Sequence, residues 1–135
     1  MILAVFVYGT LKRGQVREGC WPRQPLRVVP AETRGRLHDL GPYPALIPGP
    51  DRVKGELWFL AETDVAETLR VLDEVECYGI EDVDLYVRRV VECRTLDDDQ
   101  WHSAYVYFLA DESYARRHPA VSTRADGLAE WPPGT

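Results

Sequence analysis

The chain opens on an unbroken apolar run that changes abruptly into a polar turn. Residues 2–7 are Ile-Leu-Ala-Val-Phe-Val, followed by Tyr8-Gly9-Thr10-Leu11 and then by Lys12-Arg13-Gly14. Six apolar residues that end at a glycine turn predict a buried strand. The turn is either an ordinary β-turn or a loop whose backbone N–H groups point into one small space. Such a loop makes a site for an anion or a developing oxyanion.

Further along the chain, the apolar stretches predict four more strands, at residues 33–39, 53–60, 86–94 and 101–109. The acidic turn at residues 96–99 joins the last two and favours an antiparallel hairpin. Prolines at 22, 25 and 30 predict that residues 15–30 are irregular, and clusters of proline and glycine predict turns at 41–44 and 48–50. The segment from Ser113 has no clear pattern, and residues 131–135 are expected to be extended or frayed.

One segment, residues 64–76, has helical periodicity. Its apolar residues recur at the spacing of a single helix face, and Asp64 with Glu67 three positions later matches a capping box. On a helical wheel with Val65 at about 0°, the apolar stripe centres near about 10° and Glu76 falls near about 20°. A carboxyl group on such a stripe is costly unless it is paired or functional. Burial would raise its pKa toward neutrality, as a general acid/base requires. The alternative is that the helix ends near Val75 and Glu76 turns into solvent.

These elements predict an α+β fold. Residues 101–109 carry bulky side chains on both faces of their strand, which suits a curled or closed barrel with the helix packed against it. A length of 135 residues suits a single domain spanning residues 1–135, in which the part after about residue 110 is poorly assigned.

Composition narrows the possible functions. The chain has 16 basic and 22 acidic residues and a net charge of −6, which argues against nucleic-acid binding and, more weakly, against binding to anionic membranes. The three cysteines are odd in number and lack metal-ligand spacing, as expected for free thiols in a reducing compartment. No apolar run approaches the roughly 18 residues of a membrane helix, and the start lacks a signal-peptide pattern. We therefore expect a cytoplasmic protein. The scattered histidines suggest no metal site, and no serine stands in a nucleophile elbow.

Six short motifs follow one another along the chain. They are Tyr8-Gly9-Thr10-Leu11 with Gly14, Gly35-x-Leu37, Gly41-Pro42-Tyr43-Pro44-Ala45-Leu46, Val53-x-Gly55-Glu56-Leu57, Leu72-Asp73-x-x-Glu76 and Tyr86-x-Arg88. In this order they resemble the γ-glutamylcyclotransferase-like family. The stretch Lys12-Arg13-Gly14-Gln15 resembles the branch of γ-glutamylamine cyclotransferases.

This resemblance implies a small mixed β-barrel with flanking helices. It also implies that Tyr8, Gly9, Thr10 and Leu11 line a cavity and bind the glutamyl part of a substrate, and we expect Tyr43 of the third motif to contribute. Glu76, at the family's acidic position, would be the catalytic acid/base. The implied reaction cyclises the γ-glutamyl group of a small amine or peptide to 5-oxoproline and needs neither metal nor cofactor. The implied partner is that small molecule, and the protein is expected to be a monomer or homodimer.

The sequence departs from the family at two places. Cys77 stands where the family usually has glycine after the catalytic glutamate, which leaves the direction of Glu76 open. Val16-Arg17 follows Gln15 where proline or asparagine is usual, so leaving-group specificity can differ. Two alternatives remain on the same scaffold: a small-molecule binding protein without turnover, since a fold does not guarantee an activity, and an enzyme that removes a γ-glutamyl protecting group in biosynthesis.

Overall fold

Five strands of the chain close on themselves to form a barrel. The computed structural model describes residues 1–79 and 85–133. The barrel order is β1-β5-β4-β2-β3, and β3 pairs again with β1 to close the ring. The strands are β1 (Ala4–Val7), β2 (Arg27–Asp39), β3 (Pro44–Phe59), β4 (Tyr86–Thr95) and β5 (Trp101–Leu109).

The barrel is mixed, because β1 runs parallel to β5 and antiparallel to β3. A short strand, β6 (Leu128–Ala129), adds to the outer edge of β3 in parallel. The 86–94 and 101–109 strands form the predicted antiparallel hairpin, with Tyr86 opposite Leu109. The prediction of an α+β fold built on a small mixed barrel is therefore confirmed.

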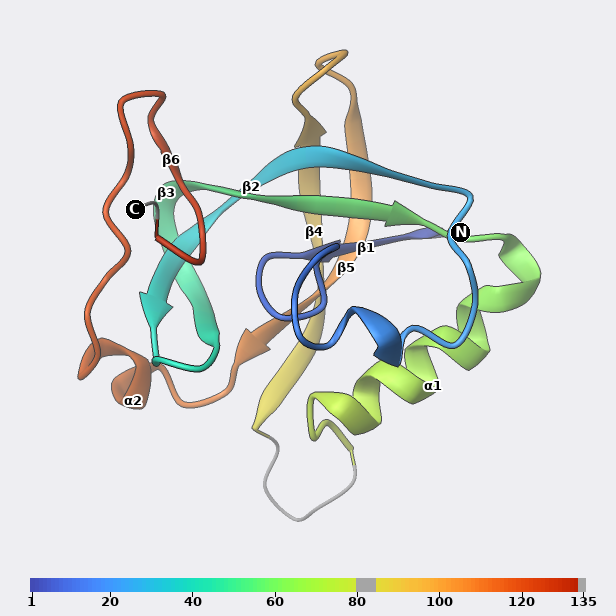
Figure 1. The fold of residues 1–135 in the computed structure, drawn as a ribbon, viewed down its shortest axis with the longest axis horizontal. Coiled ribbons are helices and arrows are strands. Elements are labelled where there is room, and N and C mark those ends of the chain that lie inside the picture. The colour runs from blue at the N-terminus through green and yellow to red at the C-terminus, as the bar shows by residue number, and fades with distance from the viewer. Residues whose placement is uncertain (80–84, 134–135) are drawn as a thin grey trace.

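The main helix, α1 (Val65–Val75), packs against the outside of the barrel, beside the N-terminal segment that carries the turn η1 (Glu18–Cys20) (Figure 1). Alternation along β1 divides the core in two. Phe6 belongs to a cluster that draws on all five barrel strands, whereas Val5 and Val7 belong to the cluster that contains the α1 residues Leu69 and Leu72. The predicted capping box does not form. Asp64 ends a short 3₁₀ turn, η2 (Glu62–Asp64), and its side chain accepts no capping hydrogen bond.

Two strands are longer than the proline pattern predicted. β2 begins at Arg27 and runs through Pro30, whose carbonyl accepts a hydrogen bond from Leu96 N–H. Proline removes a donor but leaves this acceptor free, so the strand continues. The turn predicted at residues 48–50 is instead a bulge within β3. Neighbouring residues Gly35 and Arg36 of β2 pair with Asp51 and Ile47 of β3, respectively. The residues of β3 between these two pairing positions form the bulge.

The C-terminal segment is also better ordered than predicted. It contains the one-turn helix α2 (Glu112–Arg116) and β6, and Trp131 is only 7% exposed. The indole N–H of Trp131 donates a hydrogen bond to the Asp39 carboxylate. The backbone carbonyl of Trp131 accepts one from the buried ammonium group of Lys12. The expectation of a frayed end is therefore wrong at Trp131, while residues 134–135 lie outside the described part. In that described part, no helix has the length and apolar character needed to cross a membrane.

Candidate active site

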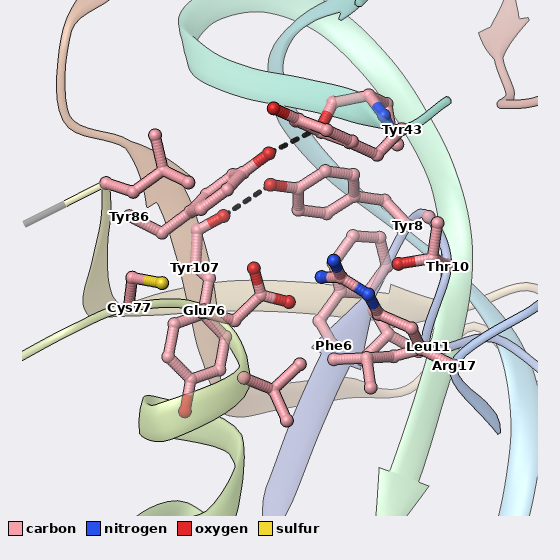
Figure 2. A pocket seen from close by; sticks show the side chains of 15 residues that line it. Phe6, Tyr8, Thr10, Leu11, Arg17, Tyr43, Glu76, Cys77, Tyr86 and Tyr107 are labelled. Atoms are coloured by element: carbon pink, nitrogen blue, oxygen red, sulfur yellow. Dashed lines mark hydrogen bonds between the residues drawn. The ribbon is translucent and has the colours of Figure 1, made fainter. Parts of the chain in front are cut away.

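A cavity opens where the end of β1, the end of α1 and the start of β3 come together. The volume open to water-sized groups inside it is about 120 Å³. Figure 2 shows side chains from these elements converging on it. All of the predicted site residues line this cavity: Tyr8, Gly9, Thr10, Leu11, Tyr43 and Glu76.

The end of α1 determines where Glu76 points. Glu76 is the C-cap residue, so the helix does end at Val75, as one of the sequence alternatives required. Its side chain nevertheless faces the cavity rather than bulk solvent. Two hydrogen bonds close the helix end: Cys77 N–H donates to the Glu74 carbonyl, and Tyr78 N–H donates to the Asp73 carbonyl. This is the pattern of a Schellman motif, which holds the C-cap residue in a defined position.

Cys77 occupies the position that a Schellman motif normally gives to glycine. Its φ of 53° lies in the left-handed region, which costs a non-glycine residue roughly 1 kcal/mol or more. The cysteine therefore adopts the left-handed conformation that glycine usually takes at this position, and the helix end is closed at the cost of backbone strain.

We expect Cys77→Gly to stabilise the folded protein by about 0.5–1 kcal/mol. Relief of the backbone strain favours folding, and it outweighs the extra freedom that glycine gives the unfolded chain. Urea unfolding measures the difference. Cys77→Ala is the matched control, since it removes the thiol but keeps the Cβ atom, and it should give no gain. Equal stability of the glycine and alanine variants would show that the backbone at this position is not strained.

Burial dominates the electrostatics of Glu76. It raises the pKa of the carboxyl group from 4.5 to about 7, and the nearby Arg17 guanidinium opposes this rise. In the part of the chain that the structure describes, no side chain or backbone group donates a hydrogen bond to this carboxylate. A carboxyl group that titrates near neutrality and has a free acceptor can take up and return a proton.

The raised pKa predicts a pH-dependent effect on stability. The folded protein keeps a proton on Glu76 up to about pH 7, whereas the unfolded chain loses it near pH 4.5. The stability contributed by this group is therefore complete below about pH 4.5 and is lost as the pH rises through about 7. We expect the free energy of unfolding of Glu76→Gln, which cannot ionise, to exceed that of the wild type by about 3 kcal/mol near pH 8.5 and by much less near pH 4.5.

Urea unfolding of both proteins at the two pH values measures this effect. Glu74→Gln is the control, because Glu74 lies two residues away and is exposed. Its difference from the wild type should change by no more than about 0.5 kcal/mol between the two pH values. If the stability of Glu76→Gln relative to the wild type were the same at both pH values, the raised pKa of Glu76 would be contradicted.

The loop after β1 supplies the donors opposite Glu76. Lys12 N–H donates to the Gly9 carbonyl, so the predicted β-turn is present, and Arg17 N–H donates to the Thr10 carbonyl. Among the described residues, no acceptor is found for the backbone N–H groups of Gly9, Thr10 and Leu11. Three consecutive unpaired donors in a loop that lines a cavity can bind an anionic group. A Cβ atom on Gly9 would lie 2.7 Å from the Pro44 ring, so the loop packs tightly against the start of β3.

Tyrosine side chains form the rest of the wall. Tyr8 donates its hydroxyl hydrogen to the Tyr107 carbonyl, and Tyr86 donates to the Pro44 carbonyl at 2.9 Å (Figure 2). Burial raises the pKa of both phenols well above the usual value, and the nearby Glu76 charge raises it further. Both therefore stay neutral. Tyr107 and Arg17 were not predicted as site residues, since neither carries a periodic signal that distinguishes it from other strand or turn residues.

No metal ligand set accompanies these groups. Within residues 1–79 and 85–133, no cluster of three or more histidine, cysteine, aspartate or glutamate side chains is arranged to hold a metal ion. The chemistry available in the cavity is that of a carboxyl group, neutral phenols, a guanidinium group and backbone amides.

Comparison with known sequences gives a consistent result. Residues 5–127 match the model of the family described as "Gamma-glutamyl cyclotransferase, AIG2-like". A Vibrio cholerae protein named "Putative gamma-glutamylcyclotransferase" is 36% identical over 72 residues, which cover 53% of this chain and 62% of that protein. The chain thus spans less than two thirds of this relative.

Solved structures share the fold. An AIG2-like protein from Mus musculus superimposes with a TM-score of 0.68 and 24% identity, covering 99% of this chain and 98% of that one. YkqA from Bacillus subtilis gives a TM-score of 0.60 at 22% identity and covers 82% of this chain, but only 36% of the longer YkqA chain is matched. At these identities the likeness establishes the barrel architecture.

Proposed function

The chain belongs to the AIG2-like gamma-glutamyl cyclotransferase family, and on that premise we propose that it cyclises the γ-glutamyl group of a small substrate to 5-oxoproline and releases the amine. Glu76 acts as the general acid/base. The loop of Tyr8, Gly9, Thr10 and Leu11 binds the glutamyl part, and Tyr43 contributes to the wall around it.

The proposed reaction begins with a proton transfer. The Glu76 carboxylate takes a proton from the α-ammonium group of the substrate, and the freed amine attacks the γ-carbonyl carbon of the same molecule. Nucleophile and electrophile are already joined, so little orientation entropy remains to be lost. The carbonyl oxygen becomes an oxyanion, and in this proposal the unpaired N–H groups of the loop stabilise it.

The second half of the reaction breaks the original amide bond. Glu76 returns its proton to the departing nitrogen as the C–N bond cleaves and the carbonyl re-forms. A second proton passes from the ring nitrogen to the same amine, again through the carboxylate. The products are the neutral lactam 5-oxoproline and an ammonium ion, and Glu76 ends as it began.

One observation carries this proposal most directly. A carboxyl group whose pKa lies near 7 and a loop in which three backbone N–H groups have no acceptor among the described residues line a single cavity, although they come from segments more than sixty residues apart. An acid/base that titrates at the operating pH together with an oxyanion site is the minimal equipment for intramolecular acyl transfer.

An assay for 5-oxoproline tests the proposal. Purified protein is incubated with γ-glutamyl amino acids, γ-glutamyl-ε-lysine and glutathione, and the lactam is quantified by mass spectrometry. We expect product from at least one of them. A folded protein that binds these compounds in calorimetry without product would be a binding protein. Turnover confined to larger γ-glutamyl conjugates would indicate removal of a protecting group.

A further inference from the structure

Arg17 differs from every other arginine of the described chain. Each of the others forms an ion pair with a carboxylate, lies over an aromatic ring or donates to a backbone carbonyl. Within the described residues, no hydrogen-bond acceptor, carboxylate or ring contacts the Arg17 guanidinium. The protein carries more acidic than basic residues, so an arginine without a partner does not reflect a shortage of carboxylates.

The side chain of Arg17 lies in the cavity. Its backbone is fixed by the 2.8 Å hydrogen bond from Arg17 N–H to the Thr10 carbonyl, which ties it to the donor loop. Figure 2 shows the guanidinium group and the Glu76 carboxylate pointing toward one another. They are not close enough to form an ion pair, although each lies within the other's electrostatic influence. The guanidinium donors therefore remain available to an anion in the cavity.

Burial orders the cavity from floor to entrance. The loop residues Tyr8, Thr10 and Leu11 are 7%, 7% and 4% exposed, so these residues form the floor. Arg17 is half-buried, and Leu85 on the same lining is 43% exposed, which places these two nearer the entrance. A γ-glutamyl group held at the floor directs its departing amine toward the entrance, because the amine must leave through it.

We propose that Arg17 binds a carboxylate on the departing amine, and thereby selects γ-glutamyl amino acids over γ-glutamyl derivatives of uncharged amines. This inference rests on the proposed function. In a γ-glutamyl α-amino acid the second carboxylate is two bonds from the departing nitrogen. That nitrogen must approach Glu76 to receive its proton, so the carboxylate comes within reach of the guanidinium that faces Glu76. Arg17 is thus a specificity-determining residue.

Two substrates that differ by one carboxylate test the proposal. They are γ-glutamyl-L-alanine and γ-glutamyl-ethylamide, which is the same molecule without the alanine carboxylate. The wild type should prefer the alanine compound in kcat/KM. Arg17→Gln should lower kcat/KM for the alanine compound about 10- to 100-fold more than for the ethylamide, the size expected for a charge-assisted hydrogen bond, whereas the effect of the lost guanidinium on the pKa of Glu76 acts on both substrates alike. Arg17→Lys keeps the charge and should retain part of the preference.

Arg23→Gln is the control, since Arg23 lies in the same N-terminal segment but is exposed and paired with Glu67; it should change neither substrate. An equal loss for both substrates in Arg17→Gln would show that Arg17 does not discriminate between them, and it would overturn the proposal. Loss for neither would overturn it as well.

Failure of the proposed function gives a different result. In that case the folded wild type releases no 5-oxoproline from any substrate of the panel, and calorimetry with the same two compounds replaces the assay. Weaker binding of γ-glutamyl-L-alanine alone by Arg17→Gln would then still support Arg17 as the carboxylate-binding residue. Unchanged or equally weakened binding of both compounds would refute it.

Discussion

Glu76→Gln is expected to reduce 5-oxoproline formation about 100- to 10,000-fold. Glutamine keeps the shape of the side chain but can neither accept a proton from the α-ammonium group nor return one, and general acid–base catalysis contributes about 10²–10⁴-fold. The raised pKa of Glu76, near 7, is what suits the residue to both roles. Initial rates with the best substrate of the panel measure the loss.

Two further variants interpret that loss. Glu74→Gln removes an exposed carboxylate on the same helix, which pairs only with Arg70 among the described residues, and its rate should match the wild type. Glu76→Asp keeps a carboxylate but withdraws it by one methylene, so activity should fall about 100-fold because the proton transfer loses its geometry. Wild-type rates in Glu76→Gln, with the thermal unfolding profile intact, would exclude Glu76 as the acid/base.

Gly55→Ala is expected to destabilise the fold by about 3 kcal/mol or more. A Cβ atom at Gly55 would lie 2.3 Å from the Val7 carbonyl oxygen and 2.7 Å from the Phe6 ring. Neither group can move away, because the backbone of Val7 is paired with β3 and Phe6 is a fully buried core residue. Relief therefore requires β1 and β3 to separate, which opens the barrel beside the donor loop. Urea unfolding gives the magnitude.

Gly19→Ala provides the comparison. Gly19 lies in the exposed turn η1, and a Cβ atom there meets nothing within 4 Å. Its stability should stay within about 0.5 kcal/mol of the wild type. If Gly55→Ala proved as stable as Gly19→Ala, the close approach of the two strands at this point would be wrong.

The periodicity of apolar residues predicted secondary structure correctly where one local pattern dominates a segment. The strand at residues 101–109 has the predicted bounds, because a run of bulky residues between an acidic turn and a polar segment allows little else. The wheel placed Glu76 on the apolar stripe, and the side chain lies on that side of α1 although the helix itself has ended. The catalytic and binding roles of the predicted residues stay predictions.

Long-range pairing accounts for what local patterns missed. Pro30 and residues 48–50 look like breakers, yet both lie within strands, because neighbouring strands supply the hydrogen bonds and a bulge takes up the extra residues. Trp131 is buried by contacts with Asp39 and Lys12, far away in the chain. Arg17 was also missed, because it differs from the other arginines only in lacking a partner among the described residues. Such a lack of contacts is visible in the structure but not in the sequence.

The pairing of β1 with β5 sets the order in which this cavity can be assembled. Val5 lies opposite Tyr105, and the Tyr8 hydroxyl reaches the Tyr107 carbonyl, so contacts about a hundred positions apart hold the donor loop. Such contacts raise the contact order and slow folding, since a long loop must close before they form. A nascent chain still short of residue 109 contains both Glu76 and the loop but lacks the strand that completes the ring. Catalytic competence is thus a late property of synthesis, acquired only when nearly the whole barrel has emerged.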